Sequence, residues 1–285
     1  MNFDSTLELE GAPVYMSYGG GKSPHYKLNS WIRECIGFQP HHAYLEPFAG
    51  MAGVFIARPK VRCEILNDLN GNVVSWWRCV RDYGDEFQHM IRWTPNSRLE
   101  YENALSILKN LPLKLPKQES KESLLKRGLA VHIVLCCSLG SISMNSGGFK
   151  SSFKRRSFVQ RDLSIIRKRI ATVQLENRCA LSILDRSSDV KDITIYVDPP
   201  YPTSYENIYS TAPLEYDDLS KLLQAQKGQV SISGYDDEWD HLGWHKSTCE
   251  GILCASSIFG RSRRERTHAL WQNYRPMPAP PSLFD

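Results

Sequence analysis

The sequence predicts an α/β fold with a largely parallel sheet and a helical segment inserted within it. Three observations predict this fold. Short apolar runs rich in β-branched residues alternate with stretches of helical periodicity. Glycines, acids or amides directly follow several of these runs, where parallel strands would end and bind ligands. Residues 81–174 carry mostly helical patterns, so this segment is expected to form a separate helical part.

Length and composition are those of a globular protein. The chain has 285 residues, of which 41% are hydrophobic and 23% charged, which suits one large domain or a core with one insertion. No apolar run approaches 18 residues and the first residues are neither basic nor apolar, so we expect a cytoplasmic protein. The eight cysteines include no Cys-x-x-Cys pair, which favours reduced core residues and predicts no metal site.

Charge is distributed unevenly along the chain. The net charge is +4, but residues 101–170 contain 14 Lys and Arg against four acids, a local net charge of +10 that leaves −6 for the rest. A basic middle segment in an otherwise acidic chain predicts a dedicated polyanion-binding segment rather than a uniformly basic protein.

A glycine-rich stretch, Tyr18 to Ser23, precedes the first predicted helix at residues 26–37. Its Gly-Lys-Ser end is typical of phosphate-binding loops, but that pattern requires a glycine at position 16, which is Met16. A ligand-binding loop and a solvated glycine-rich loop are both consistent with the stretch. The helix is amphipathic and is expected to end at Gly37.

The next two predicted strands end in residues suited to ligand binding. Residues 43–46 lead into a turn with glycines at positions 50 and 53, which allow the backbone to approach a ligand closely. Residues 62–66 lead into Asn67-Asp68-Leu69-Asn70. An acid at the end of a second strand can hold ribose hydroxyls, whereas the pattern alone is also a good helix N-cap.

The middle of the chain is predicted to be helical and basic. Helical patterns cover 71–82, 85–93, 98–110 and 121–140, the last apolar on nearly all sides. The stretch from Asn145 to Arg156 interleaves aromatic rings with cations, which suits contact with phosphates and bases but also describes a solvated charged hairpin. Residues 159–174 predict a basic helix whose outward cations are Arg161, Arg167, Lys168 and Arg169.

A buried strand at residues 193–197 leads into Asp198-Pro199-Pro200-Tyr201. Prolines cannot donate to a strand ladder, so the backbone leaves the sheet in a fixed extended path and presents a carboxylate, carbonyls and a ring together. The alternative is a Pro-Pro turn with a core tyrosine. A helix at 215–226, a strand at 229–235 and a last strand within 264–273 complete the prediction.

These motifs, in this order, resemble those of the Dam-type N6-adenine-specific DNA methyltransferases. The resemblance rests on Asp-Pro-Pro-Tyr at 198–201, on a close match to Glu-Pro-Phe-x-Gly-x-Gly-x-Val-Phe at 46–55, and on aromatic-x-Gly-Gly-Lys at 18–22. It implies a Rossmann-like, S-adenosylmethionine-dependent methyltransferase core at residues 1–80 and 175–274. It also implies a mostly helical, basic DNA-recognition insert at 81–174 and a flexible proline-rich tail at 275–285.

The resemblance implies roles for particular residues. Asp198 and the Pro199 carbonyl would each accept an N–H bond from the adenine amine, and Tyr201, after Pro200, would stack on the flipped base. The residues implied to hold S-adenosyl-L-methionine are Tyr18, Lys22, Glu46, Phe48, Gly50, Asp68 and Asp198. Those implied to contact double-stranded DNA are Asn145, Lys150, Lys154, Arg155 and Arg156. This chemistry needs no metal.

Some positions depart from the family pattern. Cys179-Ala180-Leu181 stands where the family has a polar or acidic residue beside a phenylalanine, in a short strand near the adenine of the donor. His268 stands where a glutamate is expected in the last strand, and no Pro-x-Gly follows Phe149. The alternatives are therefore a non-catalytic DNA-binding protein on a methyltransferase scaffold and an amino-methyltransferase acting on cytosine.

The end of the chain carries one more pattern. Pro281-Ser282-Leu283-Phe284-Asp285 places two large apolar residues in a proline-rich segment. It resembles short bacterial peptides that dock on the replication sliding clamp, without their leading glutamine. A disordered end without a partner is the alternative.

Overall fold

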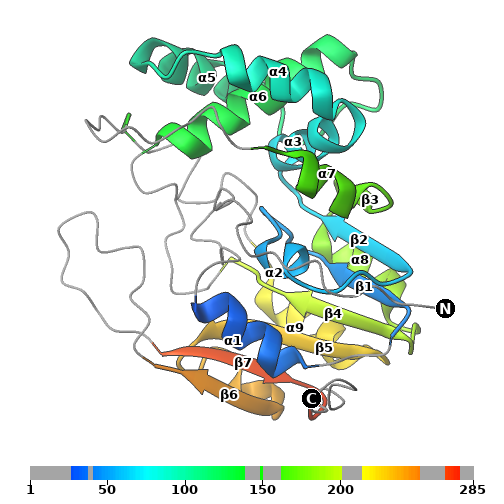
Figure 1. Cartoon of the computed structure of the whole chain (residues 1–285). Helices are drawn as coiled ribbons and strands as arrows, with labels where there is room; N and C mark the ends of the chain where they lie inside the picture. Colours follow the sequence, from blue (N-terminus) through cyan, green and yellow to red (C-terminus); the bar gives the residue numbers. More distant parts are fainter. Residues whose placement is uncertain are drawn as a thin grey trace, which may run out of the picture.

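The computed structural model describes residues 27–37, 41–138, 148–149, 162–200, 214–250 and 267–276. A seven-stranded sheet with strand order β3-β2-β1-β4-β5-β7-β6 forms its centre (Figure 1). The strands are β1 (Ala43–Glu46), β2 (Cys63–Asn67), β3 (Gln174–Glu176), β4 (Ile193–Val197), β5 (Gln229–Tyr235), β6 (His245–Cys249) and β7 (His268–Gln272). Strands β1 to β5 run parallel, and β7 is antiparallel to β5 and β6. The predicted Rossmann-like α/β fold is confirmed.

Helices cover both faces of the sheet. One face packs against α8 (Ala180–Ser187), α9 (Tyr216–Gln224) and the short 3-10 turn η1 (Asp240–Leu242). The other packs against α1 (Lys27–Ile36) and α2 (Gly53–Ile56). Because both faces are covered, all five residues of β4 are buried, which explains why this strand is a continuous apolar run rather than an alternating one.

A helical lobe lies beside the β2 and β3 end of the sheet (Figure 1). It comprises α3 (Gly71–Asp82), α4 (Gly84–Trp93), α5 (Arg98–Asn110), α6 (Lys121–Cys137) and α7 (Ser164–Ile170). Helix α6 is almost wholly buried against α3 and α5. Gly128 permits the close approach to α3, since a Cβ there would lie 2.5 Å from the Cys79 sulfur. One continuous hydrophobic core joins α1, α3 and α6, so the lobe and the sheet pack as a unit.

Most predicted elements agree closely with the structure, and β4, β5, α3 and α5 have very nearly the predicted bounds. The predicted basic helix over 159–174 is wrong in extent, because the helix α7 ends at Ile170 and the chain enters the sheet as β3 at Gln174. Arg169 does not face outward, since its guanidinium donates to both carboxylate oxygens of Glu64 at 2.7 and 2.8 Å. No sequence pattern predicts β6, a half-exposed edge strand with a polar composition.

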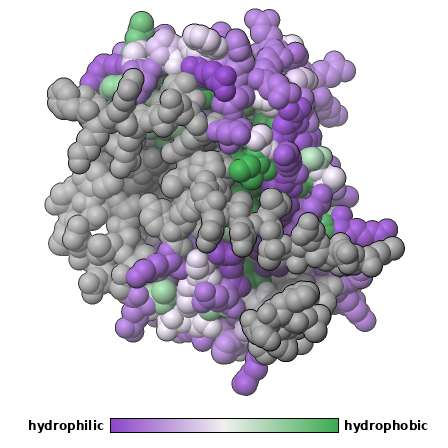
Figure 2. All heavy atoms as spheres, in the orientation of Figure 1, coloured by the Kyte–Doolittle hydropathy of each residue, from purple (hydrophilic) through white to green (hydrophobic). Residues whose placement is uncertain are grey.

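The described surface is mostly hydrophilic on the face shown in Figure 2, with isolated hydrophobic residues. The most exposed large hydrophobic side chains are Trp93 and Leu99, in the helical lobe, at 72% and 64%. Single exposed side chains of this kind are normal on a monomer. Among the described helices, none is both long and apolar enough to span a membrane.

Candidate active site

The chain order of the strands reverses between β1 and β4. From β1 the sheet continues outward through β2 and β3, and from β4 it continues through β5 in the opposite direction. Loops that leave the carboxyl ends of β1 and β4 therefore diverge, and open α/β sheets bind ligands in the crevice this creates. Glu46, Asp68 and Asp198 end or directly follow β1, β2 and β4, so the fold brings these three predicted site residues to one edge of the sheet.

Asp68 is held by backbone amides. Its Oδ2 accepts a hydrogen bond from the Gly50 N–H at 2.9 Å, and its Oδ1 accepts one from the Asn70 N–H at 2.8 Å. The side chain is only half-buried at the protein surface, yet its surroundings desolvate the carboxylate and raise the pKa to about 6, while the two amide bonds lower it. The helix cap of α3 is Asn70, whose Oδ1 accepts from the Asn72 N–H, so Asp68 itself is not the cap.

The loop after β1 is shaped around Gly50. Its φ of 49° lies in the left-handed region that favours glycine. Its N–H donates to Asp68, and its carbonyl accepts from the indole of Trp77 on α3 at 2.8 Å. The ring of the predicted donor residue Phe48 is half-buried and packs toward the α8 and α9 face of the sheet. The loop is thus fixed by partners on β2 and α3 before any ligand binds.

Two asparagines that the sequence analysis does not single out hold these loops together. Asn67 is fully buried, donates to the Pro47 carbonyl at 2.8 Å and accepts from the Arg178 N–H at 2.9 Å. Asn177, just after β3, donates to the carbonyls of Asp68 and Leu69, both at 2.9 Å. Each directly follows or ends a parallel strand, which is the signal that could have identified them.

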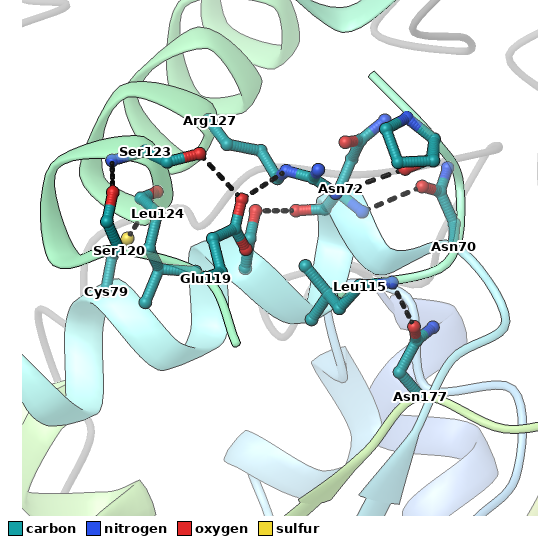
Figure 3. Close-up of polar contacts among 12 residues, drawn as sticks. Asn70, Asn72, Cys79, Leu115, Glu119, Ser120, Ser123, Leu124, Arg127 and Asn177 are labelled. Carbon is teal, nitrogen blue, oxygen red and sulfur yellow. Dashed lines mark hydrogen bonds and ion pairs between the residues drawn. The ribbon is translucent and has the colours of Figure 1, made fainter. Parts of the chain in front are cut away.

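The helical lobe braces the same loops through the linker between α5 and α6 (Figure 3). The Leu115 N–H donates to Asn177 Oδ1 at 2.8 Å, and the Gly71 N–H donates to the Leu113 carbonyl at 2.5 Å. Arg127, 1% exposed, bonds the Pro112 carbonyl at 3.2 Å and lies 3.3 Å from Glu119 Oε1. Although Arg127 counts toward the basic middle of the sequence, its charge is buried in the linker rather than displayed.

Asp198 lies at the end of β4, where the catalytic motif begins. Its carboxylate is half-buried, and Oδ1 accepts a hydrogen bond from the Ser233 hydroxyl on β5 at 2.8 Å. Pro199 is buried, and the Pro200 carbonyl accepts from the Tyr216 hydroxyl on α9 at 2.8 Å. Side chains on two elements therefore hold the start of this motif. Nothing in the sequence pattern marks Ser233 or Tyr216 for this role.

Glu46, the last residue of β1, is another acid close to Asp198. It is 2% exposed and accepts a hydrogen bond from the Tyr44 hydroxyl at 2.7 Å. Burial, with a smaller contribution from the negative charge of Asp198, raises the pKa of Glu46 to about 8. Glu46 is therefore largely protonated at neutral pH.

Several predicted site residues lie outside the described residues. They are Tyr18, Lys22, Asn145, Lys150, Lys154, Arg155, Arg156 and Tyr201, together with the tail segment proposed to bind a clamp. Phe149 forms an antiparallel bridge with Ser138, and its ring lies 5.8 Å from that of Tyr101 on α5.

The two described departures from the family pattern have distinct surroundings. The strand expected around Cys179-Ala180-Leu181 is wrong, because β3 ends at Glu176 and helix α8 begins at Ala180. Cys179 is the N-terminal flanking residue of α8, where it makes no side-chain capping bond. His268 is buried on β7, with its ring 4.8 Å from that of Tyr235 on β5. Within the described ranges, no three or more His, Cys, Asp or Glu side chains are grouped to hold a metal ion.

Comparison with known proteins places the chain in a family. No curated protein matches it significantly. Among solved structures, the rRNA methyltransferase AviRa from Streptomyces viridochromogenes aligns over 89% of this chain and 88% of that chain, with 10% identity and a TM-score of 0.34, too weak a likeness to argue from. The model of the D12 class N6 adenine-specific DNA methyltransferases matches residues 18–225, well over half of the sequence. The chain therefore belongs to the D12 class N6 adenine-specific DNA methyltransferase family.

Proposed function

We propose that this protein transfers a methyl group from S-adenosyl-L-methionine to the exocyclic N6 amine of adenine within a specific sequence of duplex DNA. Family membership makes it an S-adenosylmethionine-dependent methyltransferase. The observation that supports the finer proposal is the position of Asp198 and Pro199 at the end of β4, across the switch point from the loop that ends β1.

The residues at this edge suit activation of an aromatic amine. The lone pair of such an amine is delocalised into the ring, so the nitrogen is a poor nucleophile. In the proposal, the Asp198 carboxylate and the Pro199 carbonyl each accept one N–H bond, which favours a pyramidal nitrogen and stabilises the positive charge that develops on it. When Glu46 is protonated, it adds no negative charge beside Asp198. Asp198 is then the carboxylate that accepts the hydrogen bond from the amine.

The loops after β1 and β2 fit the methyl donor, which supplies an electrophilic methyl group on a sulfonium when bound. Asp68 is half-buried and held at both oxygens, as expected of an acceptor aimed at ribose hydroxyls. Leu69, 40% exposed, offers an apolar surface beside it for the adenine of the donor. Gly50 lacks a side chain where the backbone would approach the ligand.

The DNA-binding part of the proposal concerns the stretch from Asn145 to Arg156. In it, Lys150, Lys154, Arg155 and Arg156 contact phosphates, while Asn145 lies near bases. Tyr201 stacks on the target adenine after it leaves the duplex. The bridge between Ser138 and Phe149 supports this assignment, because it joins one residue of the stretch to the residue that follows α6.

The test is transfer of labelled methyl groups from S-adenosyl-L-methionine to duplex DNA, followed by digestion to nucleosides. We expect the label in N6-methyl-2′-deoxyadenosine and at one recurring sequence context. Label in a methylated cytosine, or label in RNA but not in DNA, would overturn the proposal. Asp198→Ala serves as the inactive control for contaminating methyltransferases.

A further inference from the structure

We propose that Ser233 is a positioning residue for Asp198, fixing the direction in which the catalytic carboxylate accepts the adenine amine. This inference rests on the proposed function. Ser233 lies on β5, beyond the residues 18–225 that match the family model, and its residue type is not part of any motif recognised in the sequence.

The Ser233 hydroxyl has two acceptors within reach and one proton to donate. Its Oγ lies 2.8 Å from Asp198 Oδ1 and 3.3 Å from the Val197 carbonyl oxygen. The shorter bond is to a carboxylate, and hydrogen bonds to charged acceptors are roughly twice as strong as neutral ones. The hydroxyl therefore donates to Asp198.

The sheet makes this contact rigid. Strands β4 and β5 are parallel neighbours with Val197 opposite Ile232, so the residues that follow, Asp198 and Ser233, lie side by side. Strand β5 continues to Tyr235, and Ser233 pairs with Leu270 of β7 on its other side. Asp198 stands where β4 has ended, whereas Ser233 is 2% exposed within a central strand. A fixed strand thus orients a residue at the start of a loop.

A second hydroxyl, on β4, donates a hydrogen bond to Ser233. The Tyr196 hydroxyl donates to Ser233 Oγ at 3.3 Å, and Tyr196 is 3% exposed. Burial, reinforced by the nearby charge of Asp198, raises the pKa of Tyr196 well above its usual range, so the phenol keeps its proton and remains a donor. Successive hydrogen bonds polarise one another, so the Tyr196 bond strengthens the one from Ser233 to Asp198.

The consequence for catalysis is specific to the chemical step. The nitrogen lone pair must point at the methyl group, so the plane of the Asp198 carboxylate must be correct when the amine donates to it. Removing the Ser233 hydroxyl removes the hydrogen bond that holds Oδ1 in that plane. Ser233→Ala leaves the Asp198 carboxylate and the other proposed DNA and donor contacts in place, so the loss should appear in kcat and not in KM.

The experiment compares Ser233→Ala with Ser231→Ala, using single-turnover methylation of duplex DNA, donor titration and thermal melting. Ser231 is a matched control: it is on the same strand and face, is 0% exposed, and bonds the Tyr274 hydroxyl at 2.9 Å instead of Asp198. Ser233→Ala should lower the methylation rate by roughly 10–100-fold relative to the control, the range expected for one hydrogen bond to a charged group. KM for DNA and donor affinity should change by less than about threefold.

Two further variants separate positioning from packing. Ser233→Thr keeps the hydroxyl on a β-branched side chain that suits a strand, so it should recover most of the rate. Tyr196→Phe should reduce the rate by roughly threefold, because it removes only the supporting bond. A Ser233→Ala rate within about threefold of Ser231→Ala, or a matching loss of donor affinity, would overturn the inference. So would a normally melting Ser233→Thr protein as slow as Ser233→Ala. If the wild-type enzyme methylates another base, the proposed function fails, while the Ser233 comparison can still be made on that product.

Discussion

The ends of β2 and β4 each present an acid, but the two acids are held in different ways. Both oxygens of Asp68 accept from backbone amides, those of Gly50 and Asn70. Asp198 is instead oriented by a side-chain hydroxyl on the neighbouring strand. Backbone donors survive most substitutions, whereas a hydroxyl is lost with one. If the proposed roles hold, the donor site depends on the loop conformation, whereas the orientation of the proposed catalytic carboxylate depends on particular side chains.

The largest expected effect follows from replacing Asp198. Asp198→Ala should lower methyl transfer by at least roughly 10²–10³-fold, as when one preorganised group is removed at a reacting centre. Asp198 is one of the residues implied to hold the donor, but donor affinity should fall far less than the rate, since the other proposed donor contacts are made mainly by the loops after β1 and β2. Single-turnover methylation measured beside thermal melting and donor titration tests this. A variant that melts normally and still methylates at a near wild-type rate would refute the role given to Asp198.

Replacing Asp68 should weaken donor binding more than the methyl-transfer rate, the opposite of the pattern expected for Asp198→Ala. Asp68→Ala should weaken S-adenosyl-L-methionine binding by roughly 10–100-fold, the value of hydrogen bonds to a charged group, with kcat largely recovered at saturating donor. Because its pKa is raised to about 6, the wild-type carboxyl gains a proton as pH falls through this value, and donor affinity should weaken there. Calorimetric titrations at several pH values check both points. In Asp68→Asn the pH dependence should disappear, and its persistence would assign the titration to another group.

The sequence predicts the parts of this site that depend on local pattern. The β4 strand and the Asp198 that follows it form a contiguous signal, as do the glycine turn after β1 and the acid after β2. Parallel strands present their carboxyl ends at one edge, so the meeting of these segments also follows from the sequence. The fold class and most helix bounds are confirmed for the same reason.

What sequence reasoning does not find is held by contacts between distant segments. Asn67 and Arg178 meet across 111 positions, and Arg169 and Glu64 across 105. Counting Lys and Arg residues in the sequence includes Arg127 and Arg169 as if both were exposed. In the structure Arg127 pairs with Glu119 and Arg169 with Glu64, and both side chains lie inside the protein. Ser233 is one of two serines on β5, and only the β4–β5 register shows which one lies beside Asp198.

The basic stretch from Asn145 to Arg156 is a third region, whose effect should be independent of both acids. Arg155→Ala with Arg156→Ala should weaken DNA binding by roughly tenfold at low salt, since each phosphate contact contributes about −0.9 to the slope of log affinity against log salt. Donor affinity should not change. Arg167→Ala is the matched control, because Arg167 is paired with Asp85 at 2.7 Å and should leave the salt slope unaltered. Equal slopes for the double variant and the wild type would show that these two arginines do not contact phosphates.

The smallest expected effect concerns Glu46, the protonated neighbour of Asp198. Its pKa is raised from 4.5 to about 8 in the folded protein, so between these values the folded state binds a proton that the unfolded state has released. Stability from this group is therefore complete below about pH 4.5 and is lost as pH rises toward 8. Glu46→Gln imitates the protonated acid and should flatten this decline while keeping methyl transfer within about threefold of wild type at pH 7. Urea unfolding at pH 6 and pH 8.5 measures the difference. A decline of equal size in both proteins would mean that Glu46 ionises normally, and that two full negative charges stand beside the target amine.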